Sequence, residues 1–239
     1  MDNVLRIRPS LGEVRYQGLA IPVADIELGG VPRGAALILC EQGELSSTAD
    51  EIGNRFAEHG YESTTADLVT LLGPGSADDA IAGALQVLLR HVSRRDWTTD
   101  QIGVLGYGQS GRASLIAAAR FPVGAAVSAA ARLEDVVNGL SPYSFSLAVP
   151  WLGMFAADAA TEASRVRSFG DAVDAASKAF TTVLGYTQAG RSFYRDSREP
   201  WEQAAAFDSW QRTVEWFNLR VVPRPTPLAQ AWRARQGAA

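Results

Sequence analysis

A stretch of ten residues has the order that presents a catalytic nucleophile. Residues 102–111 read Ile-Gly-Val-Leu-Gly-Tyr-Gly-Gln-Ser-Gly. A buried strand there leads at once into a turn of small residues and then into a helix, which is the outline of a nucleophile elbow. The central residue of such a turn presents its side chain above the sheet, and small residues two positions away on either side let the strand and the helix approach.

Two registers of this turn are open. If Gly108 is the centre, its neighbours at two positions are Gly106 and Ser110, and both are small. If Ser110 is the centre, Gly108 precedes it but Arg112 follows, and a long charged side chain enters the tight contact. The size rule favours Gly108. Ser110 remains the alternative nucleophile.

Two histidines, His59 and His91, are the candidates for a general base. His59 precedes Gly60 at the end of an expected helix, at the edge of the sheet opposite the strand carboxyl ends where ligand pockets form. His91 lies between Arg90 and Arg94 on an amphipathic helix, which favours a solvated helix face. Neither position is predicted to be catalytic.

Composition excludes several classes of protein. The 239 residues are 47% hydrophobic and 20% charged, as in a globular chain with one substantial core. The net charge is −4 and basic residues are scattered among acidic ones, so neither nucleic acid nor an anionic membrane is an expected partner. With two histidines and one cysteine, we expect no metal site and no cofactor. Cys40 has no partner for an intramolecular disulfide and the N-terminus lacks a secretory signal, which predicts a cytoplasmic protein.

Apolar runs alternate with segments of helical period, the pattern of a mostly parallel sheet covered by helices on both faces. We therefore predict a three-layer α/β sandwich as a single domain over residues 1–221. Expected strands are 35–40, 62–67, 101–107, 123–130, 149–156 and 179–186, and expected helices are 47–59, 78–94, 109–120, 161–177 and 200–219. Residues 222–239 form a proline-rich tail ending in a short helix that carries Trp232.

Six segments together resemble the dienelactone hydrolase family of α/β-hydrolases. Its elbow Gly-Tyr-Cys-Leu-Gly-Gly is similar to residues 106–111, with Gly108 in place of the cysteine. The other segments are 38–41, 59–61, 67–68, 153–158 and 188–193. The resemblance covers about residues 15–218 and implies the α/β-hydrolase fold.

The resemblance also implies that the catalytic triad is degenerate. Matched position by position, the cysteine, aspartate and histidine of the family become Gly108, Asp158 and Arg191. Glycine has no nucleophilic side chain, and arginine stays protonated and cannot act as a base. The covalent mechanism of the family is therefore not expected here.

A pocket is expected beyond the carboxyl ends of the strands. It would be lined by Glu41, Gln42, Tyr107, Gly108, Gln109, Asp158 and Arg191, with Tyr143 and Phe145 on a covering loop. In the family, backbone N–H groups near Gln42 and Gln109 build the oxyanion hole, so an enolate, phenolate or carboxylate is a fitting ligand.

Two of these side chains have two interpretations each. Glu41 is either a proton carrier or a carboxylate hydrogen-bonded to nearby backbone. Arg191 either pairs with Asp158 or clamps an anionic substrate. Cys40, which precedes Glu41 in the expected strand, is expected to be buried and inert.

These observations predict a protein that binds a small apolar carbonyl compound, or promotes its non-covalent cyclisation or isomerisation, with Glu41, Asp158 and Arg191 as the acting groups. The alternative is an ester or lactone hydrolase whose nucleophile is Ser110. A third hypothesis assigns a structural role to the tail, which is either a frayed end or an arm across a partner. An exposed Trp232 favours the arm and hence a homodimer.

Overall fold

The structure of the protein is a computed structural model, which describes residues 6–73, 76–130, 132–138, 140, 146–187, 193–194 and 200–236. In these residues eight strands form one sheet in the order β1-β2-β4-β3-β5-β6-β7-β8. The strands are β1 Ser10–Tyr16, β2 Leu19–Ile26, β3 Gly34–Leu39, β4 Tyr61–Ala66, β5 Ile102–Tyr107, β6 Ala125–Ala130, β7 Trp151–Ala156 and β8 Thr181–Tyr186. Strands β4, β3 and β5 to β8 are parallel, and β2 joins β4 in the antiparallel sense.

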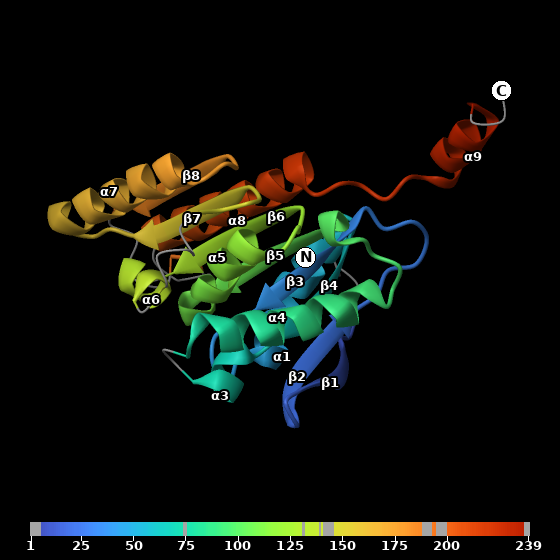
Figure 1. The fold of residues 1–239 in the computed structure, drawn as a ribbon, viewed down its shortest axis with the longest axis horizontal. Helices are drawn as coiled ribbons and strands as arrows, with labels where there is room; N and C mark the ends of the chain where they lie inside the picture. Colours follow the sequence, from blue (N-terminus) through green and yellow to red (C-terminus); the bar gives the residue numbers. More distant parts are fainter. Residues whose placement is uncertain are drawn as a thin grey trace.

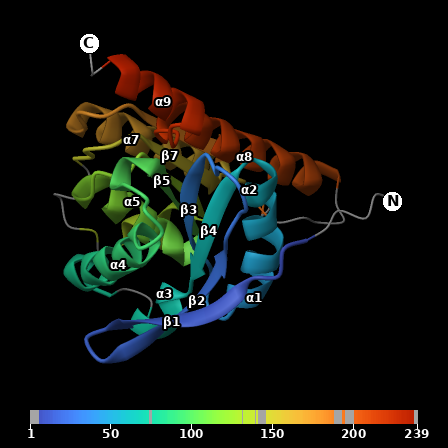
Figure 2. The same cartoon turned by 90° about the vertical axis from the view of Figure 1, so that its right-hand side faces the viewer.

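Helices cover both faces of the sheet (Figures 1 and 2). The α-helices of the described residues are α1 Leu45–Thr48, α2 Asn54–Glu58, α3 Leu68–Leu72, α4 Asp78–Ser93, α5 Gly111–Arg120, α6 Leu133–Val137, α7 Ala160–Ala176, α8 Pro200–Arg220 and α9 Pro227–Gln236. A π-helical turn, Ala49–Gly53, joins α1 to α2. Helices α4, α5 and α7 pack on one face, while α2 and α8 pack on the other. The predicted three-layer α/β fold is confirmed.

The central strands explain why the sheet could be predicted. Every residue of β3, β5, β6 and β7 is buried, because helices cover both sides of these strands. Along β3, Leu37 and Leu39 face the α4 side, and Ala36 and Ile38 face the α8 side. All six predicted strands and all five predicted helices are present, with ends shifted by at most two residues; the first predicted helix is the continuous run of α1, the π-helical turn and α2.

The hairpin of β1 and β2 is an addition to the predicted elements. These strands pair in register from Ser10–Asp25 to Tyr16–Leu19, across a turn at Gln17 and Gly18 whose φ angles are both positive. Four of the first five residues of β1 are exposed, so the segment lacks the continuous apolar run of the central strands. Short helices α3 and α6 were likewise not expected.

Candidate functional site

The turn after β5 has the geometry of an elbow centred on Gly108. Its φ is +53°, in the left-handed region where a residue with a side chain is strained. Gly106 lies so close to the start of the helix that a Cβ atom on it would be 2.6 Å from the carbonyl carbon of Ser110. A glycine at both positions therefore allows the sharp turn and the close approach of strand and helix.

Glu41 occupies the space above Gly108. A Cβ atom on Gly108 would lie 2.8 Å from the carboxyl carbon of Glu41 and 2.9 Å from its Cγ. The O–H of Tyr194 donates a hydrogen bond to Oε1 of Glu41 at 3.0 Å. The Tyr194 ring lies against the Tyr107 ring, with 5.1 Å between centroids. The carboxylate is thus held where a side chain at the elbow would begin.

Buried hydroxyl groups hold the elbow from beneath. Ser110 is 2% exposed, and its Oγ donates to the backbone carbonyl of Cys40 at 2.7 Å. The carbonyl of Gly111 accepts from Ser128 at 2.7 Å and from Ser114 at 2.9 Å. Trp151 on β7 donates through Nε1 to Ser128 at 2.9 Å. The Ser110 hydroxyl thus ties the turn to the end of β3, and Ser128 and Trp151 tie the start of α5 to β6 and β7.

Three adjoining hollows surround the elbow. The one over Gly108 has a volume of about 350 Å³ and is lined by Glu41, Gln42, Glu44, Gly108, Gln109, Arg132 and Asp135. A second, of about 340 Å³, shares Gln109 and Asp135 with it and has an apolar wall of Leu68, Val69, Leu72 and Ile81. The third, of about 220 Å³, lies on the other side of Glu41 against Tyr107 and Tyr194. Polar groups therefore gather over Gly108, next to an apolar compartment.

Arg132 lines the central hollow and was missed by the sequence analysis. It follows β6 and donates from Nη2 to Oδ1 of Asp135 at 2.7 Å, while half of its side chain stays exposed. The hydrogen bond and the charge of Asp135 raise the pKa of its guanidinium further above the ordinary value. Its place in the sequence could have predicted this role, because it follows a buried strand by two residues and so lies at the edge of the sheet where α/β proteins bind ligands.

The other predicted pocket residues are Asp158, Arg191, Tyr143 and Phe145. Asp158 is exposed two residues beyond the end of β7 and is not among the residues that line these hollows. Arg191, Tyr143 and Phe145 lie outside the described residues. The structure thus brings together Glu41, Gln42, Tyr107, Gly108 and Gln109 from the predicted set.

The two histidines lie away from the elbow. His59 is exposed at the end of α2, against the ring of Trp210. His91 is not on a solvated helix face, so that expectation was wrong: its Nε2 lies 2.9 Å from Oδ2 of Asp25, and its side chain is 22% exposed. The pairing could not be read from α4 alone, because Asp25 comes from β2. Within the described ranges, no three His, Cys, Asp or Glu side chains are grouped as a metal site would need.

Cys40 is fully buried at the end of β3, where its Sγ lies 3.4 Å from the carbonyl oxygen of Ala66. Burial, together with the nearby Asp67 carboxylate, raises the pKa of its thiol to about 12. We expect a thiol-specific disulfide reagent at pH 8 to react with the denatured chain and not with the native protein, because only a thiolate reacts.

The same shift predicts a pH dependence of stability. Above about pH 9 the thiol of the unfolded chain loses its proton, while the thiol of the native state keeps it. The free energy of unfolding is therefore unaffected by this group below pH 9 and decreases as the pH rises from 9 to about 12. In urea titrations over this range, Cys40→Ala should lose less stability than the unchanged protein. Equal losses would contradict the assignment.

None of the described helices is long and apolar enough to cross a lipid bilayer.

Comparison with known proteins gives a consistent set of relatives. The family model described as "Dienelactone hydrolase family" matches residues 31–220. A "Putative carboxymethylenebutenolidase" of Yersinia pestis is 27% identical over 197 residues, covering 78% of this chain and 73% of the relative. Another of that name, from Salmonella typhi, is 28% identical over 172 residues, and the matched part is 63% of its length.

Solved structures agree on the fold. A "Putative Dienelactone Hydrolase" from Klebsiella pneumoniae superposes with a TM-score of 0.68 at 22% identity, covering 88% of this chain and 98% of that one. A "Dienelactone Hydrolase-like Promiscuous" phosphotriesterase from metagenomic libraries gives 0.65 at 16% identity, covering 91% of this chain and all of that one. At these identities the likeness concerns the fold.

Proposed function

Because the chain belongs to the dienelactone hydrolase family and carries a glycine at the centre of its elbow, we propose that it is not a hydrolase. We propose instead that it binds a small apolar carbonyl compound above Gly108 and promotes a non-covalent, cofactor-free cyclisation or isomerisation. The observation that carries this proposal is the position of Glu41, whose carboxylate occupies the space in which a nucleophilic side chain would start.

Glu41 is the proton carrier in this proposal. A carboxylate can remove a proton next to a carbonyl group and return it to another atom of the same compound, without a covalent intermediate. Tyr194 holds one carboxylate oxygen, which orients the group over the central hollow. The charge that develops on the carbonyl oxygen would be met by the backbone N–H of Gln109, at the start of the helical segment where such groups lack an intrahelical acceptor.

The ligand class follows from the two hollows that share Gln109. The apolar wall of Leu68, Val69, Leu72 and Ile81 suits a hydrocarbon body, and the polar groups over Gly108 suit its carbonyl end. The proposal also includes Asp158 as a second proton carrier and Arg191 as a clamp for an anionic group. It includes the degenerate triad as well, in which Gly108, Asp158 and Arg191 stand at the positions of the family's cysteine, aspartate and histidine. A cytoplasmic location is likewise proposed, from the lone cysteine.

The hydrolase alternative requires Ser110 to be the nucleophile. Its Oγ is buried and donates to the carbonyl of Cys40, and Arg112 occupies the position where a small residue would be needed. Both features weigh against this alternative.

The test uses 2-tetralone, a bicyclic ketone, as the probe. Exchange of its α-protons with D2O, followed by NMR, should be faster with the protein than without it. Glu41→Gln should reduce the protein-dependent rate by about 100-fold or more, the usual contribution of a positioned acid or base. Glu13→Gln, an exposed glutamate on β1, is the matched control and should not change the rate.

Two outcomes would overturn the proposal. One is an exchange rate that Glu41→Gln leaves unchanged. The other is turnover of p-nitrophenyl acetate, with a covalent adduct from a fluorophosphonate probe, that disappears in Ser110→Ala while the fold is retained.

A further inference from the structure

The C-terminal helix stands apart from the rest of the protein. Figure 1 shows α9 at the end of an extended segment, away from the sheet and its helices. Its side chains are exposed along almost its whole length, including Leu228 at 76% and Trp232 at 55%. Leu228, Trp232 and Arg235 are spaced so that they share one face of the helix. A helix of ten residues with such a face needs a surface to cover it.

The root of this arm, residues 222–226, is firmly held. Arg224 donates from Nη2 to the carbonyls of Arg95 and Asp96, at 3.0 and 2.9 Å, and its guanidinium lies 3.6 Å from the centre of the Trp97 ring. The backbone N–H of Arg224 also donates to the carbonyl of Arg33 at 2.8 Å. These contacts make the start of the arm a fixed part of the domain.

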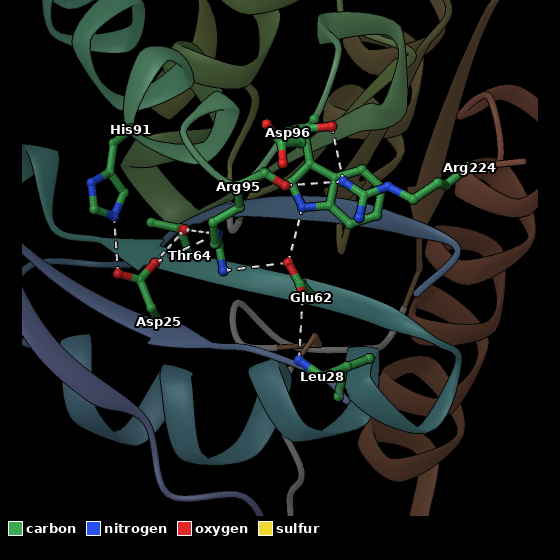
Figure 3. Close-up of polar contacts among 9 residues, drawn as sticks. Asp25, Leu28, Glu62, Thr64, His91, Arg95, Asp96 and Arg224 are labelled. Carbon is green, nitrogen blue, oxygen red and sulfur yellow. Dashed lines mark hydrogen bonds and ion pairs between the residues drawn. The ribbon is translucent and has the colours of Figure 1, made fainter. Parts of the chain in front are cut away.

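A polar cluster behind the root strengthens it (Figure 3). Trp97 donates from Nε1 to Glu62 at 2.9 Å, and Glu62 lies 3.7 Å from Arg95. Arg95 donates to Thr64 at 2.6 Å and lies 3.6 Å from Asp25, which also pairs with His91. The surface against which Arg224 packs is thus braced by charged groups from β2, β4 and α4.

Charge separates the arm from the domain. Residues 222–239 contain three arginines and no acidic residue, a net charge of +3. The whole chain has 22 basic and 26 acidic residues, so residues 1–221 have 19 basic and 26 acidic ones, a net charge of −7. The arm is therefore attracted to the body of this same protein.

The body has a groove that fits a short helix. It lies between the helical segment of α1 and α2 and helix α8, with a volume of about 980 Å³. Its lining includes the exposed carboxylates of Asp50, Glu51 and Glu58. The arginines Arg6 and Arg55 also line it, as does Phe207, which is 62% exposed. Among the described residues, no cation pairs with those three carboxylates.

We propose that α9 of one copy lies in this groove of a second copy and that the exchange is mutual, giving a homodimer. Leu228 and Trp232 would cover Phe207, and Arg235 would face the carboxylates of the groove. Each copy carries both an arm and a groove, as a two-fold symmetric exchange requires. A helix that lies in a groove is a recurring mode of recognition, and here the opposite charges of the arm and the groove carboxylates favour the pairing.

The test measures the dimer dissociation constant of the 239-residue chain by sedimentation velocity over a range of concentrations. Trp232→Ala should weaken the dimer at least about tenfold, because an aromatic anchor carries a large share of such an interface. The matched control is Leu19→Ala, a 52% exposed residue at the start of β2, which should leave the dissociation constant unchanged. Both positions are exposed, so neither substitution should affect folding.

A charge exchange identifies the occupant of the groove. Arg235→Glu in the arm and Glu58→Arg in the groove should each weaken the dimer, and an equimolar mixture of the two variants should associate more tightly than either alone. In that mixture both contacts pair opposite charges. Asp171→Arg on α7, which changes an exposed acid outside the groove by the same charge, should leave the dissociation constant unchanged.

A chain that is monomeric at every concentration overturns the proposal, and so does a dimer that Trp232→Ala leaves intact. Docking of the helix on its own domain would appear as the first of these outcomes.

Discussion

Gly106→Ala is expected to lower the free energy of unfolding by about 3 kcal/mol, at the upper end of the usual cost of overpacking. The new Cβ atom would lie 2.6 Å from the carbonyl carbon of Ser110 and 2.9 Å from the backbone nitrogen of Gly111. Both are backbone atoms at the start of the helix, so no side-chain rotation can make room. Helix α5 would have to move away from β5.

Gly12→Ala is the matched control for this change. Gly12 is also in a strand, but a Cβ atom there would meet only Val23, at an ordinary 3.6 Å. Alanine at such a position is expected to be neutral or slightly stabilising, because it restricts the unfolded chain. Urea denaturation of both variants gives the comparison. If Gly106→Ala were as stable as Gly12→Ala, the close approach of strand and helix would be refuted.

Asp78→Ala is expected to cost about 3 to 5 kcal/mol, the range for removing one partner of a buried ion pair. Asp78 opens α4 and accepts from Nη2 of Arg112 at 2.6 Å, and both side chains are 6% exposed. Arg112 also donates from Nη1 to the carbonyl of Asn138 at 2.8 Å. Without the carboxylate, a buried guanidinium loses the group that balances its charge.

The next residue along α4 supplies the control. Asp79 pairs with Arg120 at the surface, where its side chain is 91% exposed, and Asp79→Ala should cost less than about 1 kcal/mol. The double variant Asp78→Leu with Arg112→Met should recover most of the stability lost in Asp78→Ala, because no unbalanced charge then remains. Denaturant titrations at pH 7 measure all three, and equal costs for Asp78→Ala and Asp79→Ala would contradict the burial of the pair.

The sequence predicted the fold because its central strands are short, continuous apolar runs. The segments 35–39 and 102–105 are buried on both faces. A strand buried in this way consists of consecutive apolar residues, so it can be recognised from the residue types alone. The hairpin of β1 and β2 lies at the edge of the sheet, where one side is exposed and the apolar run is broken. Its turn at Gln17 and Gly18 was a signal that the pattern of apolar runs did not capture.

The site was less predictable because it depends on pairs far apart in the sequence. Position after a strand placed Glu41 near Gly108, but not the carboxylate above the elbow or the hydrogen bond from Tyr194, 153 residues away. The pairing of His91 with Asp25 spans 66 residues and reversed the expected environment of that histidine. The order of the strands determines which side chains come to the same edge of the sheet. It does not determine the direction in which each side chain points.

The hydroxyl groups beneath the elbow have a consequence for how this protein can change over evolution. Ser110, Ser114 and Ser128 secure the turn by donating to backbone carbonyls, and Trp151 donates to the hydroxyl of Ser128. None of these bonds involves a side chain at position 108. Selection on the reaction and selection on the turn therefore act on separate residues. A lineage can exchange the reacting group and inherit the cavity around it unaltered.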